Sequence, residues 1–275
     1  MLDFHMHTTY SDGTDNINEI IDKVRTFDYF SITDHDSIES AKYITNNGLV
    51  LPNYVRGVEL STTDNHQSVH ILFYNYDINN KVLNEIIERI DSNRKERLLE
   101  RINILKNEYN IDFKKEDIDY LLSLPNPTKP NIASIIVKYG YAENIDVAIK
   151  EFLYHKLATK KLTSEYVIKS LKNEDGILVF AHPLGGIGEQ RVDSFTLKER
   201  LSRFIEYGIK GIECCYSLYN DDEQKILIEL AKENNLIISG GSDYHGKNKK
   251  VELATLSSDD NDNYKYINLI NFIKR

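Results

Sequence analysis

Short apolar segments alternate with amphipathic ones over the first 80 residues of the chain. Buried strands are predicted over 1–4, 28–33, 54–60 and 69–74. Apolar residues at 17, 20, 21 and 24 follow a helical period, and a second helix is predicted over 37–46, with Ser37 as its N-cap. This alternation is typical of βα units in a parallel sheet or barrel.

The pattern changes after residue 80. Helical periodicity continues from 83 to 107 and then over 116–124, 131–139 and 145–154, without a convincing strand. Prolines at 125, 127 and 130 punctuate these segments. We therefore expect a helical insertion over 92–162 that interrupts a barrel domain formed by 1–91 and 163–275.

The alternation returns after residue 163. Helices are predicted over 165–172, 197–207 and 222–234, and strands over 176–181, 209–215 and 236–239. A surface helix over 267–274 is expected to end the chain. In such folds the carboxyl ends of the strands form the active face.

Histidines and carboxylates collect at these strand ends. His5 and His7 are two residues apart and can face the same metal ion, and Asp12-Gly13 turns back towards them. Any one of these histidines alone could be a hydrogen-bonded core residue, but the coincidence of all six favours a metal centre. The histidines are His5, His7, His35, His70, His182 and His245, and the carboxylates are Asp12, Asp34, Glu59 and Asp243.

The chemistry of this set indicates which ions it suits. Imidazole and carboxylate ligands fit Mn²⁺, Fe²⁺ or Zn²⁺. Six histidines exceed what one tetrahedral ion uses, so two or three divalent ions are expected. A carboxylate such as Glu59 can bridge two of them.

Charge and composition limit the partners. The 275 residues include 34 Lys and Arg against 43 Asp and Glu, a net charge of −9, which argues against a stable nucleic-acid complex or binding to acidic membranes. A phosphorylated substrate remains compatible if bound cations reverse the local sign. We find no signal peptide and no apolar span of about 18 residues, and the only two cysteines are the adjacent Cys214 and Cys215. A cytoplasmic protein is therefore expected.

Several motifs together resemble one known family. The sequences at 5–13 (HMHTTYSDG), 33–36 (TDHD), 57–61 (GVELS), 69–71 (VHI), 181–183 (AHP) and 241–246 (GSDYHG) occur in the order typical of the polymerase and histidinol phosphatase (PHP) superfamily. They span nearly the whole chain outside the helical insertion. Within the superfamily the chain looks like the branch of nucleoside 3′,5′-bisphosphate phosphatases, which also holds AMP phosphatases and 5′-to-3′ ribonucleases.

The resemblance implies an α/β fold, a distorted seven-stranded (β/α) TIM-like barrel with a small helical insertion. It also implies three metal positions. The first would use His5, His7, Glu59 and Asp243, the second Glu59, His70 and His182, and the third Asp12, His35 and His245.

The expected reaction is hydrolysis of a phosphate ester by water that the metals activate. Asp12, His35, His182 and Asp34 are the catalytic candidates. The proton for the leaving group could come from a second metal-activated water or from His182. Asp34 could orient a liganding imidazole or cap a helix.

The substrate is less defined by the sequence. Relatives in that branch often carry Arg-Pro-His-Ile-Ala in the insertion, where this chain has Lys129-Pro130-Asn131-Ile132-Ala133, and the segment 184–191 also departs from the usual Gly-Arg-Tyr. Lysine keeps the charge but loses the planar fork of arginine. Arg94, Arg97, Lys129 and Arg191 are candidates for binding the phosphate, with a solvated helix face or loop as the alternative.

A small nucleotide, either a 3′,5′-bisphosphate or a nucleoside monophosphate, is the expected substrate. The alternatives are histidinol-phosphate phosphatase activity and 5′-to-3′ exonuclease activity on short RNA. A metal-binding regulatory protein without turnover is the alternative from another functional class.

Overall fold

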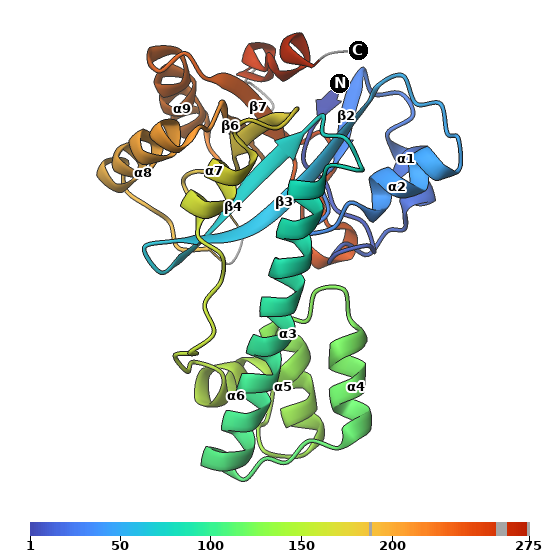
Figure 1. Cartoon of the computed structure of the whole chain (residues 1–275), viewed down its shortest axis with the longest axis vertical. Coiled ribbons are helices and arrows are strands. Elements are labelled where there is room, and N and C mark those ends of the chain that lie inside the picture. Colours follow the sequence, from blue (N-terminus) through green and yellow to red (C-terminus); the bar gives the residue numbers. More distant parts are fainter. Residues whose placement is uncertain (187–188, 257–262, 274–275) are drawn as a thin grey trace. The chain divides into compact units, whose positions relative to one another are not determined.

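A computed structural model of the chain describes residues 1–186, 189–256 and 263–273. Its seven strands form one sheet in the order in which they occur along the chain (Figure 1). They are β1 (Leu2–Asp3), β2 (Tyr29–Ile32), β3 (Tyr54–Asp64), β4 (Gln67–Tyr74), β5 (Ile177–Phe180), β6 (Gly211–Tyr216) and β7 (Ile237–Gly241).

The first and last strands meet and nearly close the sheet into a barrel. The N–H of Phe4 donates to the carbonyl of Gly240 (3.1 Å), and the N–H of Asp243 donates to the carbonyl of His5 (2.8 Å). Glycine is required at Gly241, because a Cβ there would lie 2.2 Å from the Cβ of His5. The predicted distorted seven-stranded barrel is confirmed.

The parallel arrangement that the alternation indicated does not hold at β4. This strand runs antiparallel to both β3 and β5, and β3 and β4 are the two long neighbouring strands at the centre of Figure 1. The chain reverses between Asp64 and Gln67 through Asn65 and His66, whose φ angles are 47° and 66°. Two residues with positive φ form the kind of turn that matches the twist of a hairpin.

Helices pack around this sheet. They are α1 (Ile17–Lys23), α2 (Glu39–Asn46), α7 (Ser164–Leu171), α8 (Ser194–Tyr207) and α9 (Asp221–Glu233). The first helix begins with a capping box between Asn16 and Glu19, and α1 packs its apolar face on Met6 and Phe30 beside the first two strands. These contacts hold the segment after β1 against the barrel.

Two sequence predictions about helix ends are wrong. The cap of α2 is Ile38, not Ser37, and it makes no side-chain hydrogen bond. The chain ends in short 3₁₀ turns over Asn263–Tyr266 and Leu269–Phe272 instead of the expected α-helix over 267–274, whose residue 274 lies outside the described part. Leu269 is buried, and the side chain of Asn268 accepts the N–H of Ile238, so this segment is tied to β7.

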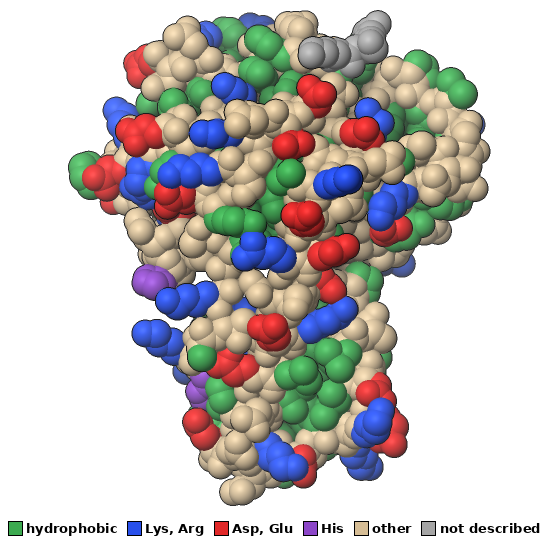
Figure 2. All heavy atoms as spheres, in the orientation of Figure 1, with side chains coloured by type: hydrophobic (Ala, Val, Ile, Leu, Met, Phe, Trp, Pro, Cys, Tyr) green, Lys and Arg blue, Asp and Glu red, His purple; other side chains and the backbone are tan. Residues whose placement is uncertain are grey.

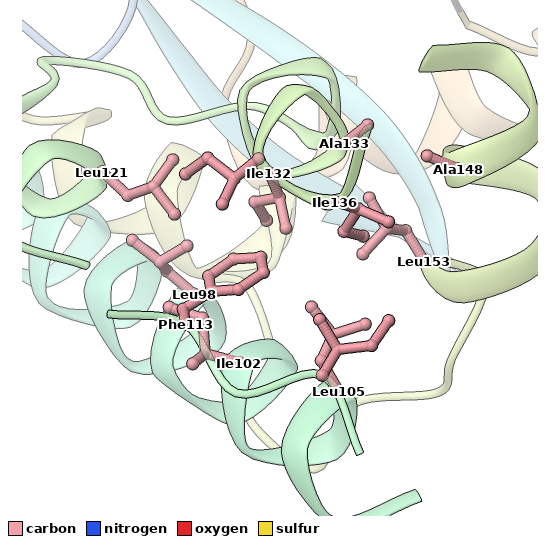
Figure 3. Packing of buried hydrophobic residues seen from close by; sticks show 12 residues of the cluster. Leu98, Ile102, Leu105, Phe113, Leu121, Ile132, Ala133, Ile136, Ala148 and Leu153 are labelled. Atoms are coloured by element: carbon pink, nitrogen blue, oxygen red, sulfur yellow. The ribbon is translucent and has the colours of Figure 1, made fainter. Parts of the chain in front are cut away.

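The chain divides into two compact units, one formed by residues 1–87 and 162–275 and the other by 88–161. The second unit contains most of α3 (Lys81–Tyr109) together with α4 (Lys115–Ser123), α5 (Lys129–Lys138) and α6 (Ile145–Phe152). Figure 3 shows Leu98 and Ile102 of α3 facing Phe113, Leu121 and Ile132 in a shared core. That the insertion is a domain of its own stays a prediction.

Charged side chains of both signs are interspersed over the face shown in Figure 2. In the described part of the chain, no helix is both long and apolar enough to cross a membrane.

Candidate metal centre

The histidines and carboxylates predicted as ligands converge at one end of the barrel. His5 and His7 follow β1, His35 follows β2, Glu59 lies within β3, and His182 follows β5. His70 lies near the beginning of β4. Because β4 is antiparallel, its beginning lies beside the carboxyl ends of the parallel strands, and His70 is paired with Ser61 of β3.

Glu59 is at the centre of this arrangement, and its side chain is buried. Its Oε2 lies 3.1 Å from His5 Nε2, 3.2 Å from His7 Nε2 and 3.1 Å from His35 Nδ1. Its Oε1 lies 3.1 Å from His70 Nδ1 and 2.9 Å from His182 Nε2. The two oxygens of one carboxylate therefore face two different groups of imidazoles.

The first of these groups also includes Asp243. Its Oδ1 lies 3.3 Å from His7 Nε2 and 3.6 Å from His5 Nε2. Ligand atoms about 2.0–2.1 Å from a tetrahedral ion lie about 3.3 Å from one another. The separations among His5, His7, Glu59 and Asp243 match that spacing.

A third group surrounds Asp12, which comes from the loop after β1. Its Oδ1 lies 3.2 Å from His245 Nε2 and its Oδ2 lies 3.9 Å from His35 Nε2. His7 Nδ1 is 3.8 Å from Asp12 Oδ1. At 29% exposure of its side chain, Asp12 is the most open of the carboxylates in the centre.

Hydrogen bonding accounts for only some of these contacts. Among the described residues, several buried atoms that point into the centre have no hydrogen-bond partner. They are Nε2 of His5, His7 and His245, Nδ1 of His35 and His182, Oδ1 of Asp12, Oε2 of Glu59 and Oε1 of Glu189. Buried polar atoms are rarely left unsatisfied, and divalent cations would satisfy this set of imidazole and carboxylate donors. The residues present therefore fit a centre of divalent metal ions.

The carboxylates in the centre are held in the charged form. Burial raises the pKa of Glu59, but the nearby imidazoles of His35, His5 and His70 outweigh burial and hold this pKa well below its usual range. The same competition lowers the pKa of Asp12, through His35 and His245. Anionic oxygens are the form in which these side chains bind cations.

Two side chains hold the outer oxygen of Asp243. Tyr216 donates its hydroxyl to Asp243 Oδ2 (2.8 Å), and Lys249 donates from Nζ to the same oxygen (2.7 Å). These contacts leave Oδ1 directed at His5 and His7. Neither Tyr216 nor Lys249 was predicted from the sequence, because no motif marks them.

Two ligand candidates have unusual backbone conformations. His182 has a φ of 26° and Asp243 a φ of 58°, in the left-handed region that non-glycine residues seldom occupy. The N–H of His182 donates to Glu213 Oε2 (2.8 Å), and that of Asp243 to the carbonyl of His5. Such conformations persist where surrounding contacts fix them, and they concentrate at functional sites.

Asp34 does not contact an imidazole in the way that the sequence suggested. It accepts the N–H of Thr8 (2.7 Å) and the hydroxyls of Thr8, Ser11 (2.8 Å) and Ser40. Ser11 in turn lies 3.4 Å from His7 Nδ1. Asp34 therefore fixes the loop that carries Asp12 and reaches His7 only through Ser11.

Sequence reasoning missed two further carboxylates. Glu213 lies within β6, fully buried, with Oε1 2.9 Å from His5 Nδ1. Glu189 lies in the segment after His182, with Oε1 3.4 Å from His70 Nδ1 and Oε2 2.9 Å from His182 Nδ1. Burial raises the pKa of Glu189, but the His182 and His70 imidazoles lower it to about 2. The position of Glu213 within an otherwise apolar strand could have indicated it, since a carboxylate inside a buried strand needs a partner.

The phosphate-binding candidates contact other parts of the chain within their own units. Arg191 pairs with Glu223 at the beginning of α9 and stacks over Tyr219, so it supports the fold around that helix. Arg94, Arg97 and Lys129 lie in the 88–161 unit. There Arg94 donates to the carbonyl of Pro125, Arg97 to that of Thr159, and Lys129 lies 4.1 Å from the ring centroid of Tyr154.

Proteins of known activity resemble the chain over nearly its whole length. It is 26% identical over 267 residues to the 5′-3′ exoribonuclease Rnm of Escherichia coli strain K12, covering 92% of this chain and 88% of that protein. It is 24% identical over 267 residues to the phosphoribosyl 1,2-cyclic phosphate 1,2-diphosphodiesterase of Eggerthella lenta, covering 90% and 95%. No protein-family model matches the sequence.

Two solved structures share the fold. One, described as a metal-dependent phosphoesterase from Bifidobacterium adolescentis, is 24% identical with a TM-score of 0.72, and the match covers 98% of both chains. The other, an amidohydrolase from Chromobacterium violaceum with bound sulfate, is 22% identical with a TM-score of 0.70, and the match covers 93% of both chains. The shared fold and the similarity to these relatives agree with the resemblance of the sequence motifs to the PHP superfamily of metal-dependent phosphoesterases.

Proposed function

We propose that the chain hydrolyses phosphate esters at the centre around Glu59, with two or three divalent ions, Mn²⁺, Fe²⁺ or Zn²⁺, as cofactors. The observation that carries the proposal is the convergence of five imidazoles on the two oxygens of this one buried carboxylate at ligand spacing. His5, His7 and Asp243 would hold the first ion with Glu59, His70 and His182 the second with Glu59, and Asp12, His35 and His245 the third.

Divalent ions in such a centre supply an activated water and neutralise charge on the phosphate. The chain's own residues set the conditions for that chemistry. Asp12 is the most open carboxylate and stays ionised, so it can hold a cation and orient the attacking water by accepting a hydrogen bond at Oδ1 or Oδ2. His182 directs Nε2 at Glu59, which favours a ligand role over a role as acid for the leaving group.

The relatives favour a nucleotide substrate. Exoribonuclease Rnm and the cyclic phosphate diphosphodiesterase both act on phosphoesters of ribose compounds, as their names state. We therefore propose a small phosphorylated nucleotide as the substrate, with 5′-to-3′ removal of nucleotides from short RNA as the second candidate. The net charge of −9 disfavours extended contact with a long polymer.

The cationic side chains of the insertion are proposed to bind a phosphate of that substrate. Besides burial, Arg101 and Arg97 lower the pKa of Lys129, so three positive charges lie close together in this unit. Placing like charges close together costs free energy, and an anion bound between them offsets that cost. Asn131 is not available in the same way, because its side chain accepts the N–H and hydroxyl of Thr128.

Both cysteines are free and buried, as expected in a reducing compartment such as the cytoplasm. That location is part of the proposal.

A hydrolysis panel tests the function. Adenosine 3′,5′-bisphosphate, AMP, histidinol phosphate and a short 5′-phosphorylated RNA are each incubated with purified protein, with added Mn²⁺ or with a chelator. We expect metal-dependent release of phosphate or nucleotide from at least one nucleotide substrate, and a loss of roughly 10²-fold or more in the Glu59→Gln variant. Hydrolysis of histidinol phosphate alone would overturn the nucleotide assignment.

Absence of hydrolysis across all substrates and metals, by protein shown to hold ions, would favour the regulatory alternative. For the insertion, Lys129→Ala is expected to raise KM several-fold with little change in kcat, and Lys138→Ala serves as the matched control. An unchanged KM in K129A would contradict its proposed contact with phosphate.

A further inference from the structure

Glu189 lies in the segment that follows His182. Its side chain is mostly buried, at 12% exposure, and turns back over the pair His70 and His182. The N–H of Gly186 donates to Glu189 Oε2 (2.9 Å), which fixes the carboxylate in this position. Glu189 lies outside all the motifs that resemble the PHP superfamily.

The surroundings of His70 Nδ1 show what Glu189 adds. This one nitrogen lies 3.1 Å from Glu59 Oε1, 3.4 Å from Glu189 Oε1 and 3.3 Å from His182 Nε2. An imidazole nitrogen carries at most one proton and cannot donate to three acceptors. A cation bound by all four side chains satisfies each of these atoms.

The remaining contacts of Glu189 point the same way. Its Oε1, the oxygen that lies 3.4 Å from His70 Nδ1, is buried and lacks a hydrogen-bond partner among the described residues. His70, His182 and Glu189 each offer a ligand atom within 4.8 Å of the others. Glu189 would also add a negative charge beside a divalent ion that otherwise has only the carboxylate of Glu59, which it shares with the first ion.

We propose that Glu189 is a fourth protein ligand of the cation held by Glu59, His70 and His182. The proposal rests on the metal centre of the proposed function and deepens it. Sites with three protein ligands keep an open position for water, whereas sites with four are closed and hold their ion more firmly. This position would therefore hold its ion as firmly as the four-ligand position of His5, His7, Glu59 and Asp243, and water would be activated at the more open position near Asp12.

Metal binding by the Glu189→Gln variant tests the proposal. Glutamine keeps a carbonyl oxygen that can accept the Gly186 N–H, so a purely structural role predicts no change in metal binding. A ligand role predicts that one ion binds about 10- to 100-fold more weakly. Bound Mn²⁺ or Zn²⁺ is counted by elemental analysis after dialysis, and affinities are measured by competition with a chelating dye.

Glu199→Gln, on the exposed face of α8, makes the same change of charge and should bind metal as the wild type does. Glu189→Asp keeps the charge but shortens the reach, and it should recover part of the lost affinity. Circular dichroism and thermal unfolding show that each variant is folded. If E189Q fails to fold, E189D is compared with E199Q instead, and E189D is expected to bind one ion more weakly.

The outcomes distinguish a failure of this proposal from a failure of the proposed function. Wild-type protein that holds ions, with E189Q holding them equally well, would overturn the role of Glu189 and leave the metal centre standing. Wild-type protein that holds no divalent ion would overturn both.

Discussion

The side chains of His5 and Glu213 face each other, with His5 Nδ1 2.9 Å from Glu213 Oε1, and both are fully buried. The contact assigns the proton of the ring to Nδ1 and leaves Nε2 to face Glu59 and Asp243. The other oxygen of Glu213 accepts the N–H of His182. One outer carboxylate therefore orients His5 and fixes the backbone of a second ligand, an arrangement that tunes metal ligands in many proteins.

Glu213→Gln should weaken metal binding and stability together. An amide has one acceptor oxygen, so its NH₂ group must oppose either the His5 ring N–H or the His182 N–H. We expect a loss of about 1–3 kcal/mol in the free energy of unfolding and about 10- to 100-fold in metal affinity. Chemical denaturation and metal titration measure the two effects. Equal metal affinity in E213Q and wild type would contradict the proposed coupling.

Metal affinity should rise with pH. Burial lowers the pKa of His7, but hydrogen bonding to the Asp243 and Glu59 carboxylates raises it above the ordinary 6.5 to about 9 in the metal-free protein. The first ion must displace that proton at neutral pH. We expect affinity to increase between about pH 6.5 and 9, with proton release measured by calorimetry in two buffers of different ionisation enthalpy. A pH-independent affinity over this range would contradict the expectation.

The stability of the metal-free protein should change in the opposite direction. A histidine whose pKa is raised on folding stabilises the fold fully below its unfolded pKa, and this stabilisation disappears as pH rises through the folded pKa. For His7 the window runs from 6.5 to about 9. Chelator-treated protein should therefore lose stability across that window in denaturant unfolding. Stability that increases with pH there would show that another group dominates.

Divalent ions should stabilise the folded chain. A ligand that binds only the native state adds about 2.7 kcal/mol at a concentration of 100 times its Kd. Thermal unfolding with Mn²⁺ or Zn²⁺, against the same protein with chelator, should show a rise in Tm of several degrees. Mg²⁺, which prefers oxygen ligands, is expected to shift Tm less.

The insertion should be destabilised without loss of metal. Ile136 of α5 is fully buried in the core of the 88–161 unit, and Ile136→Ala should cost about 2–5 kcal/mol. Ile145→Ala, at a residue that is 42% exposed, should change stability by no more than about 0.5 kcal/mol. Metal content should match the wild type in both. Loss of bound ions in I136A would show that the two units are coupled.

Much of the barrel could be predicted from periodicity, because apolar strands and amphipathic helices differ in period. The direction of β4 could not, since alternation looks the same in parallel and antiparallel strands. The reversal of direction occurs in the turn at Asn65 and His66, which adopt positive φ between two long paired strands. The prediction of a C-terminal α-helix was wrong because helical periodicity carries no information about tertiary contacts. One such contact is the hydrogen bond between Asn268 and β7.

The candidate ligands were predictable where they follow strands in short motifs, as His5, His7 and His182 do. Glu189 and Glu213 were not, because their roles depend on contacts between segments distant in sequence. Glu213 touches a residue 208 positions away. For Asp34 the motif left two roles open, orienting an imidazole or capping a helix, and its hydrogen bonds go to Thr8, Ser11 and Ser40.

The meeting of β1 with β7 has a consequence for synthesis on the ribosome. His5 and His7 emerge first, while Asp243 and His245 follow more than 200 residues later, and the hydrogen bond from Phe4 to Gly240 joins the two ends. Contacts of such separation form late, because a long loop must close before they contribute. A nascent chain therefore cannot form the Asp243 contacts until translation has passed β7. Until then the growing polypeptide lacks the complete ligand set of the first ion.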